Sequence, residues 1–123
     1  MSTPLRDASA LVALLCALAA NPAAAQQMAE SDGVYLRGLD KVSGGTTDLA
    51  MRVGDTLSYG RMSVTLSACR YPADNPAADA FAFVEITDEL RGERLFYGWM
   101  IASSPALNAL DHPRYDIWVL GCQ

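Results

Sequence analysis

Residues 62–70, MSVTLSACR, show the clearest alternation of apolar and polar side chains in the chain. Apolar side chains (Met62, Val64, Leu66) alternate with small polar ones along this stretch. A period of two is typical of a half-buried β-strand, because successive side chains point to opposite faces of a sheet. By this count Cys69 falls on the polar face. We therefore expect its disulfide, if it forms one, at a strand end or under a covering segment, unless a bulge resets the alternation.

Further strands are expected on both sides of this one, separated by turns rich in glycine, proline and charge. They cover residues 34–40, 47–53, 80–87, 94–101 and 115–122. The third and fourth of these are apolar on both faces apart from Glu85, and a short charged turn between them favours a β-hairpin. We expect Glu85 to pair with an arginine rather than to act as an acid.

One short helix is expected just before the last strand. Ser104 is a favourable N-cap, and Pro105 suits the first helical position because its missing N–H would have no partner there. Leu107 and Leu110 would share one face of this helix, over residues 105–111. The predicted fold is mainly β: a small antiparallel barrel or sandwich of about six strands with one short helix before the last strand.

The first 25 residues have the layout of a secretory signal peptide. An uninterrupted run of small and apolar residues, 8–20, follows Arg6 and leads to Ala23 and Ala25, which form an A-x-A cleavage site. The run is shorter than the ~20 apolar residues of a membrane-spanning helix, which disfavours an uncleaved anchor. We predict cleavage after Ala25, export to the periplasm, and no membrane span after cleavage.

Cleavage would leave a single domain with two cysteines. Residues 26–33 are polar and lack periodicity, so we expect a flexible lead-in, followed by one β domain over 34–123. Cys16 leaves with the signal, and Cys69 and Cys122 remain. An even number of cysteines in an exported chain indicates a disulfide, and two free buried thiols are the alternative.

Composition and charge exclude several classes of protein. The chain has 123 residues, of which 51% are hydrophobic and 19% charged, with a net charge of −5. It is too apolar to be disordered, and its acidic balance argues against nucleic acid as a partner. No glycine-rich phosphate loop, paired-cysteine metal motif or nucleophile elbow occurs in the sequence, so we expect no cofactor and no metal.

The most distinctive residues cluster between 98 and 118, a stretch that holds both tryptophans and the only histidine. A Ser/His/Asp hydrolase would combine Ser103 or Ser104 with His112 and with Asp111 or Asp116. Ser104 is already explained as the N-cap of the predicted helix, and His112 as the residue at which that helix stops. We therefore predict no catalytic residue.

Aromatic residues near this stretch permit two interpretations. Tyr97, Trp99, Tyr115 and Trp118 would form a platform for a sugar or peptide, or they would be core. Their apolar neighbours favour the core for both tryptophans. Because loops carry specificity while strands hold them in place, the candidate interaction surface centres on the segment before the last strand. Its residues are Trp99, Ser103, Asn108, His112, Tyr115 and Asp116.

Motifs spread over the predicted domain carry a family resemblance. They are Gly38-Leu39-Asp40-Lys41-Val42, Gly60, Cys69-Arg70, Ala80-Phe81 and, most specifically, residues 98–122. These stretches resemble a bacterial exported family catalogued as domain of unknown function 2155. The resemblance implies an exported bacterial protein that retains both cysteines. It implies no activity, so no catalytic residue is carried over.

These observations favour a non-catalytic interaction module of the bacterial cell envelope, with an envelope protein as its partner. A small-ligand or glycan-binding domain using the aromatic residues near 97–118 is the alternative. A small hydrolase is less favoured, because one histidine and one lysine leave few groups for an active site.

Overall fold

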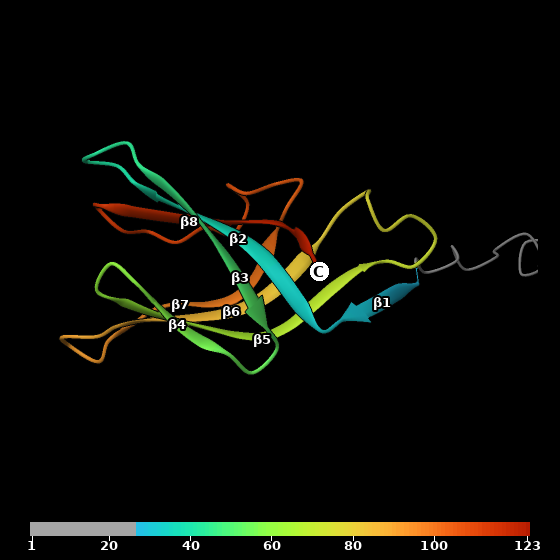
Figure 1. Ribbon diagram of the computed structural model, residues 1–123, viewed down its shortest axis with the longest axis horizontal. Coiled ribbons are helices and arrows are strands. Elements are labelled where there is room, and N and C mark those ends of the chain that lie inside the picture. Colours follow the sequence, from blue (N-terminus) through green and yellow to red (C-terminus); the bar gives the residue numbers. More distant parts are fainter. Residues whose placement is uncertain (1–26) are drawn as a thin grey trace, which may run out of the picture.

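The computed structural model describes residues 27–123, which form eight β-strands and no helix (Figure 1). The strands are β1 (Met28–Ser31), β2 (Gly33–Asp40), β3 (Thr46–Arg52), β4 (Thr56–Tyr59), β5 (Met62–Pro72), β6 (Phe81–Asp88), β7 (Arg94–Ile101) and β8 (Tyr115–Cys122). All six predicted strands are present with nearly the predicted ends, and the mainly β class is confirmed. The predicted signal peptide and its cleavage site lie outside the described residues.

Two antiparallel sheets form a sandwich. One sheet has the order β1-β5-β6-β7, with β4 also paired to β5, and the other has the order β3-β2-β8. The predicted hairpin is the β6–β7 pair. Strands β7 and β8 are not paired with each other, so the sheets do not close into a barrel. Of the two architectures that the sequence left open, the structure has the sandwich.

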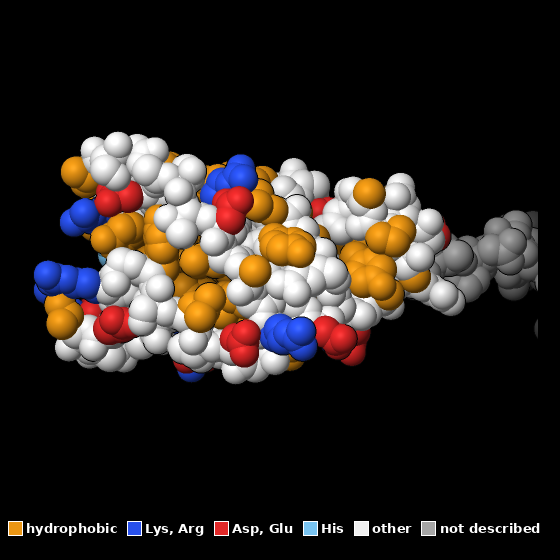
Figure 2. All heavy atoms as spheres, in the orientation of Figure 1, with side chains coloured by type: hydrophobic (Ala, Val, Ile, Leu, Met, Phe, Trp, Pro, Cys, Tyr) orange, Lys and Arg blue, Asp and Glu red, His pale blue; other side chains and the backbone are white. Residues whose placement is uncertain are grey.

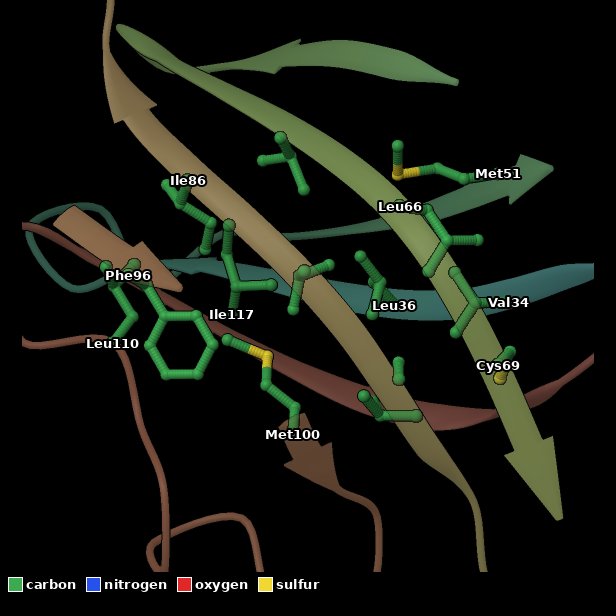
Figure 3. Packing of buried hydrophobic residues seen from close by; sticks show 14 of the residues in the cluster. Val34, Leu36, Met51, Leu66, Cys69, Ile86, Phe96, Met100, Leu110 and Ile117 are labelled. Carbon is green, nitrogen blue, oxygen red and sulfur yellow. The ribbon is translucent and has the colours of Figure 1, made fainter. Parts of the chain in front are cut away.

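The core lies between the sheets and is apolar throughout the described residues. Strands β2, β3 and β5 to β8 each contribute buried side chains from one face, as the alternation in the sequence predicts. Leu36 and Ile117 from one sheet meet Leu66 and Ile86 from the other (Figure 3). Leu110, from the segment that connects β7 to β8, points in beside Phe96. This connecting segment, residues 102–114, therefore helps to cover the open edge of the sandwich.

A β-bulge explains how a cysteine on the expected polar face becomes buried. The register between β5 and β6 shifts between Leu66 and Ala68. Such a shift inverts which residues face the core, and Cys69 is only 1% exposed. Cys69 forms a disulfide with Cys122 at the end of β8, which confirms the predicted pairing. The bond links the two sheets covalently.

The predicted helix over residues 105–111 is wrong. The backbone forms turns there, in which the N–H of Leu107 donates to the C=O of Ser104 at 3.1 Å. Leu110 is 5% exposed and Leu107 is 74% exposed, so they do not share a buried face. A helix of two turns gains little from its own hydrogen bonds, and contacts with β7 and the core set the path of the segment instead.

The lead-in predicted as flexible contains strand β1. This strand pairs with the edge of β5, where Glu30 lies opposite Arg70 and their side chains form an ion pair of 3.3 Å. Because β1 buries little, its sequence has no hydrophobic alternation to reveal it. Strand β4 was also not predicted; it forms a tight hairpin with β5 through Gly60.

Candidate functional site

Two tyrosines and two glycines form a lock at one end of the sandwich. The turns after β2, β4 and β6 gather at this end with the start of β8 (Figure 1). The rings of Tyr59 and Tyr115 meet edge to face with centroids 5.4 Å apart. A β-carbon on Gly38 would lie 2.5 Å from the Tyr59 ring, and one on Gly60 would lie 2.5 Å from the Tyr115 ring. The glycines thus provide the space that both rings occupy, and we call these four residues the tyrosine lock.

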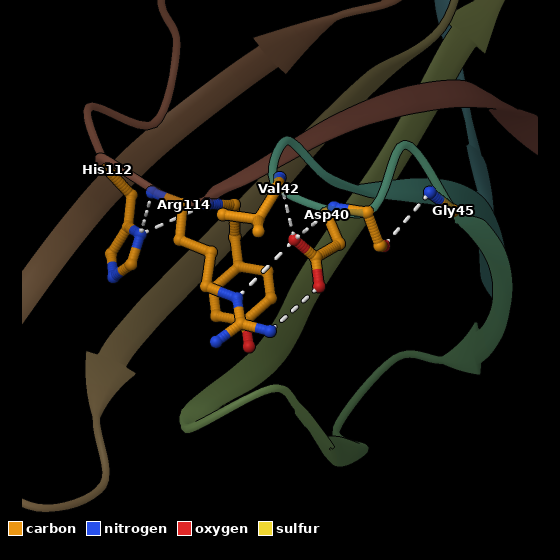
Figure 4. Close-up of polar contacts among 7 residues, drawn as sticks. Asp40, Val42, Gly45, His112 and Arg114 are labelled. Atoms are coloured by element: carbon orange, nitrogen blue, oxygen red, sulfur yellow. Dashed lines mark hydrogen bonds and ion pairs between the residues drawn. The ribbon is translucent and has the colours of Figure 1, made fainter.

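Asp40 ties the turn after β2 to the start of β8 (Figure 4). Its carboxylate accepts a hydrogen bond from the N–H of Val42 at 2.9 Å and one from Nη2 of Arg114 at 3.0 Å. The hydrogen bond from Arg114, followed by that from Val42, holds the pKa of Asp40 below its ordinary value. The pair is therefore ionised at neutral pH and fixes one loop against the other.

His112 stabilises the turn that precedes β8 (Figure 4). Its Nδ1 accepts hydrogen bonds from the backbone N–H groups of Arg114 at 3.0 Å and Tyr115 at 3.1 Å. Its backbone C=O accepts from Nζ of Lys41 at 2.7 Å. An Nδ1 that accepts carries no proton, so the neutral ring holds its proton on Nε2. The histidine acts here as a cap for backbone amides.

Ser103 is held by a carboxylate rather than by the histidine. Its hydroxyl donates to Oδ2 of Asp79 at 2.6 Å, and its N–H donates to Oδ1 at 3.0 Å. Burial alone would raise the pKa of Asp79, but the bonds from Ser103 and from the N–H of Ala80 lower it below its ordinary value. Among residues 27–123, neither Ser103 nor Ser104 forms a hydrogen bond with His112, so the structure does not assemble the triad considered for a hydrolase.

Asn108 pins the connecting segment to the unpaired edge of β7. Its side-chain amide donates to the C=O of Trp99 at 2.8 Å. Gly98 makes room for this contact, since a β-carbon there would approach the Asn108 amide nitrogen to 3.0 Å. Occupying an edge carbonyl with a side chain removes one of the groups through which another strand would pair.

The two tryptophans are not in the core, contrary to our expectation. Both are half-buried, and they lie on the outer faces of opposite sheets. Asp116 is on the outer face of β8 with Trp118, whereas Tyr115 faces inward into the tyrosine lock. The six candidate residues are therefore not brought together in one surface.

An aromatic cluster on the outer face of β5, β6 and β7 includes residues that sequence reasoning missed. The ring of Phe83 meets those of Tyr97 and Trp99 edge to face, with centroids 4.9 and 5.2 Å away. Arg70 lies over Trp99 at 5.0 Å and Arg94 over Tyr97 at 4.2 Å, both distances for cation–π contact. We call these five residues the aromatic–arginine face.

Each arginine of this face is also paired with a glutamate. Arg70 pairs with Glu30 at 3.3 Å, and Arg94 pairs with Glu85 at 3.7 Å, which confirms the expected arginine partner of Glu85. On the side of the molecule that Figure 2 shows, basic and acidic side chains are also interspersed rather than gathered in a field of one sign. In the sequence, alternation places Tyr97 and Trp99 on one face of their strand. That Phe83 lies on the same face of the sheet follows only from the register of β6 against β7.

The part of the chain that the structure describes holds no group of three or more His, Cys, Asp or Glu residues placed to bind a metal ion. No helix long and apolar enough to cross a membrane occurs in residues 27–123.

The fold and the tyrosine lock define a class of small β-sandwich domain, in which a disulfide links the two sheets. The model of a family described as "Uncharacterized protein conserved in bacteria (DUF2155)" matches residues 34–122, and this chain belongs to that family. A similar curated relative is the uncharacterized protein RP359 of Rickettsia prowazekii (strain Madrid E), 28% identical over 87 residues. The match covers 68% of this chain and 56% of the relative, so the chain spans about half of that protein's length. No solved structure matches the chain.

The motifs that carry the family resemblance correspond to contacts in the fold. Gly38 and Gly60 accommodate the tyrosine lock, and Asp40 and Lys41 hold the 112–114 turn. The cysteines form the link between the sheets. The motif residues therefore have structural roles, because they stabilise one end of the sandwich and the link between its sheets.

Proposed function

We propose that this protein is an exported, non-catalytic interaction module of the bacterial cell envelope, and that it binds a protein partner through the aromatic–arginine face. The observation that carries the proposal is the exposure of Tyr97, 56%, beside Trp99 and two arginines on one sheet face. Tyrosine, tryptophan and arginine dominate the binding energy of protein interfaces, because they offer large, rigid contact areas with a polar end.

The chemistry of this face indicates what its partner presents. Glu30 and Glu85 pair with Arg70 and Arg94, so the two positive charges of the face are balanced by two neighbouring negative charges. A partner with an apolar centre and a polar rim fits such a surface better than a strongly acidic or basic one.

Export is supported by two independent features. Residues 1–25 have the layout of a signal peptide. The Cys69–Cys122 disulfide is of a kind that persists in oxidising compartments such as the periplasm.

The absence of catalysis is proposed because the polar groups considered for it have other roles. The Ser103 hydroxyl is engaged by Asp79, and Nδ1 of His112 is engaged by two backbone amides. With Nδ1 accepting these bonds, the neutral ring carries its proton on Nε2, so neither ring nitrogen is free to remove a proton from a serine.

Site-specific crosslinking tests the proposal. A photoreactive residue placed at Thr87, opposite Arg94 in the register of β6 and β7, in the full chain in its native bacterium should form one dominant protein adduct. Tyr97→Ala and Trp99→Ala should reduce the affinity for that captured protein by about 30-fold each if they act as hot spots. The matched control is Tyr35→Ala, since Tyr35 is 47% exposed on the outer face of β2.

Circular dichroism and urea unfolding would show that each variant remains folded. Equal capture by wild type, Tyr97→Ala and Trp99→Ala would contradict binding through this face. If only Tyr35→Ala lost capture, the partner would instead bind the sheet that contains β2.

A further inference from the structure

A groove of about 390 Å³ lies on the outer side of the smaller sheet, away from the aromatic–arginine face. Trp118 of β8 and Leu39 of β2 line it from the sheet, and Pro105, Ala106 and Ala109 line it from the connecting segment. Its volume falls within the range of small-ligand sites, and its wall is mainly apolar with one indole, as such sites commonly are.

Two opposite charges line the same groove. Asp116 is two residues before Trp118 on the outer face of β8 and lies opposite Leu39 in the register of the sheet. Lys41 follows the end of β2 at the same groove, where its Nζ is held by the C=O of His112 at 2.7 Å. An ammonium has three donors, so two of them remain for a ligand.

These two charges do not neutralise each other. Within residues 27–123, neither Lys41 nor Asp116 takes part in an ion pair, although Asp116 is half-buried. A ligand that is only anionic would be repelled by Asp116, and one that is only cationic would be repelled by Lys41. A ligand with both charges would be attracted by both residues.

We infer that this groove binds a small zwitterion with an apolar body, either a free amino acid or a short peptide. The carboxylate of the ligand binds Lys41, its ammonium group binds Asp116, and its apolar part packs on Trp118 and Leu39. This site uses the opposite sheet and a different tryptophan from the proposed protein interface, so either proposal can fail without the other.

Tryptophan fluorescence provides the direct test. The chain has two tryptophans, so Trp99→Phe leaves Trp118 as the single reporter. Leucine and leucyl-leucine are the probes, and N-acetyl-leucinamide, which keeps the apolar body but lacks both charges, is the control ligand. At least one zwitterion should shift the Trp118 emission with a dissociation constant of about 1 mM or tighter, and the blocked compound should not.

Comparison of the two zwitterions distinguishes the sources, since a free amino acid and a peptide separate their charges differently. Saturable binding of leucine alone assigns the groove to amino acids, and tighter binding of leucyl-leucine assigns it to peptides. Equal binding of N-acetyl-leucinamide, or no saturable binding of either zwitterion up to about 10 mM by fluorescence and calorimetry, would overturn the inference.

Charge-removing variants test the two polar contacts. Lys41→Gln and Asp116→Asn should each weaken binding of the better zwitterion by about tenfold or more, because each removes a charge-assisted contact. Lys41→Arg keeps the positive charge and should retain most of the affinity. The matched controls are Arg52→Gln and Asp74→Asn, which make the same charge changes at exposed positions away from the groove.

Because Lys41 also holds the turn at His112, urea unfolding must accompany the titrations. A Lys41→Gln protein that stays folded and binds as wild type would refute the role of Lys41. The corresponding result for Asp116→Asn would refute recognition of the ammonium group.

Discussion

Gly60 lies directly against the ring of Tyr115, so that a β-carbon on the glycine would be 2.5 Å from the ring carbon Cζ. The glycine also has a φ of +60°, in the left-handed region that side chains disfavour. The turn between β4 and β5 thus requires glycine for two independent reasons. The contact couples this hairpin to the first residue of β8, which is distant in the sequence.

Gly60→Ala should lower the free energy of unfolding by about 3 kcal/mol, since a left-handed alanine costs about 1 kcal/mol and crowding of the ring adds about 2 kcal/mol. Urea unfolding followed by circular dichroism measures the change. Gly92→Ala is the matched control, because Gly92 has a φ of +65° but nothing within 4 Å of its missing β-carbon. It should cost only about 1 kcal/mol. Equal losses for both variants would show that the Tyr115 contact contributes nothing.

Cys122→Ala should destabilise the protein by about 4 kcal/mol. The disulfide closes a loop with a sequence separation of 53, and the chain-entropy model assigns that constraint on the unfolded state about this value. Urea unfolding with and without a reductant measures it. Wild type should lose a similar amount on reduction, whereas the variant should be insensitive to the reductant. A wild type whose stability is unchanged by full reduction would contradict a stabilising role for the bond.

Asp79→Asn should make the free energy of unfolding less dependent on pH in the acid range. Hydrogen bonds from Ser103 and Ala80 lower the pKa of Asp79 in the folded state below its unfolded value. Its contribution to stability is therefore fully present above the unfolded pKa, near 3.9, and is lost as the pH falls through the lower folded pKa. Urea midpoints measured between about pH 6 and pH 2 test this. Asp74→Asn, at an exposed position in the neighbouring loop, is the control and should keep the wild-type pH dependence.

His112→Ala should cost about 1–2 kcal/mol of stability, because two backbone N–H groups at the start of β8 lose their acceptor. His112→Asn should recover part of this loss, since its side-chain oxygen is also an acceptor. Hydrogen exchange at the amides of Arg114 and Tyr115 should accelerate in the alanine variant. A folded alanine variant with unchanged exchange but a lost function would instead indicate a direct functional role for the histidine.

The strands could be predicted because their signal is local. Alternation at residues 62–66 and the apolar runs at 80–87 and 94–101 each reflect burial of one or both faces of a strand. The disulfide was predictable once the predicted signal peptide was set aside together with Cys16, because two cysteines then remain in an exported chain. Strands β1 and β4 could not be predicted in this way, because they add hydrogen bonds at the margins of β5 and bury few side chains.

The candidate site was less predictable, because its residues acquire their roles from distant partners. Ser103 and His112 are residue types that can form a catalytic pair. In the fold, however, Ser103 bonds to the carboxylate of Asp79, and His112 bonds to backbone amides. Trp99 and Trp118 have apolar neighbours in the sequence, yet both face outward. Which face of a strand meets the core depends on register and on the opposite sheet.

The mainly β class and the extents of six strands follow from side-chain periodicity in the sequence, and the cysteine pairing follows from the two cysteines that remain after the predicted cleavage. In contrast, the open arrangement of the two sheets and the turns over residues 105–111 follow from tertiary contacts. The β-bulge between Leu66 and Ala68, which turns Cys69 inward, also belongs to the tertiary structure. Each of these depends on pairing and packing between segments far apart in the chain. Such contacts contribute enough free energy to override local preferences, as Leu110 and Asn108 do where a helix was expected.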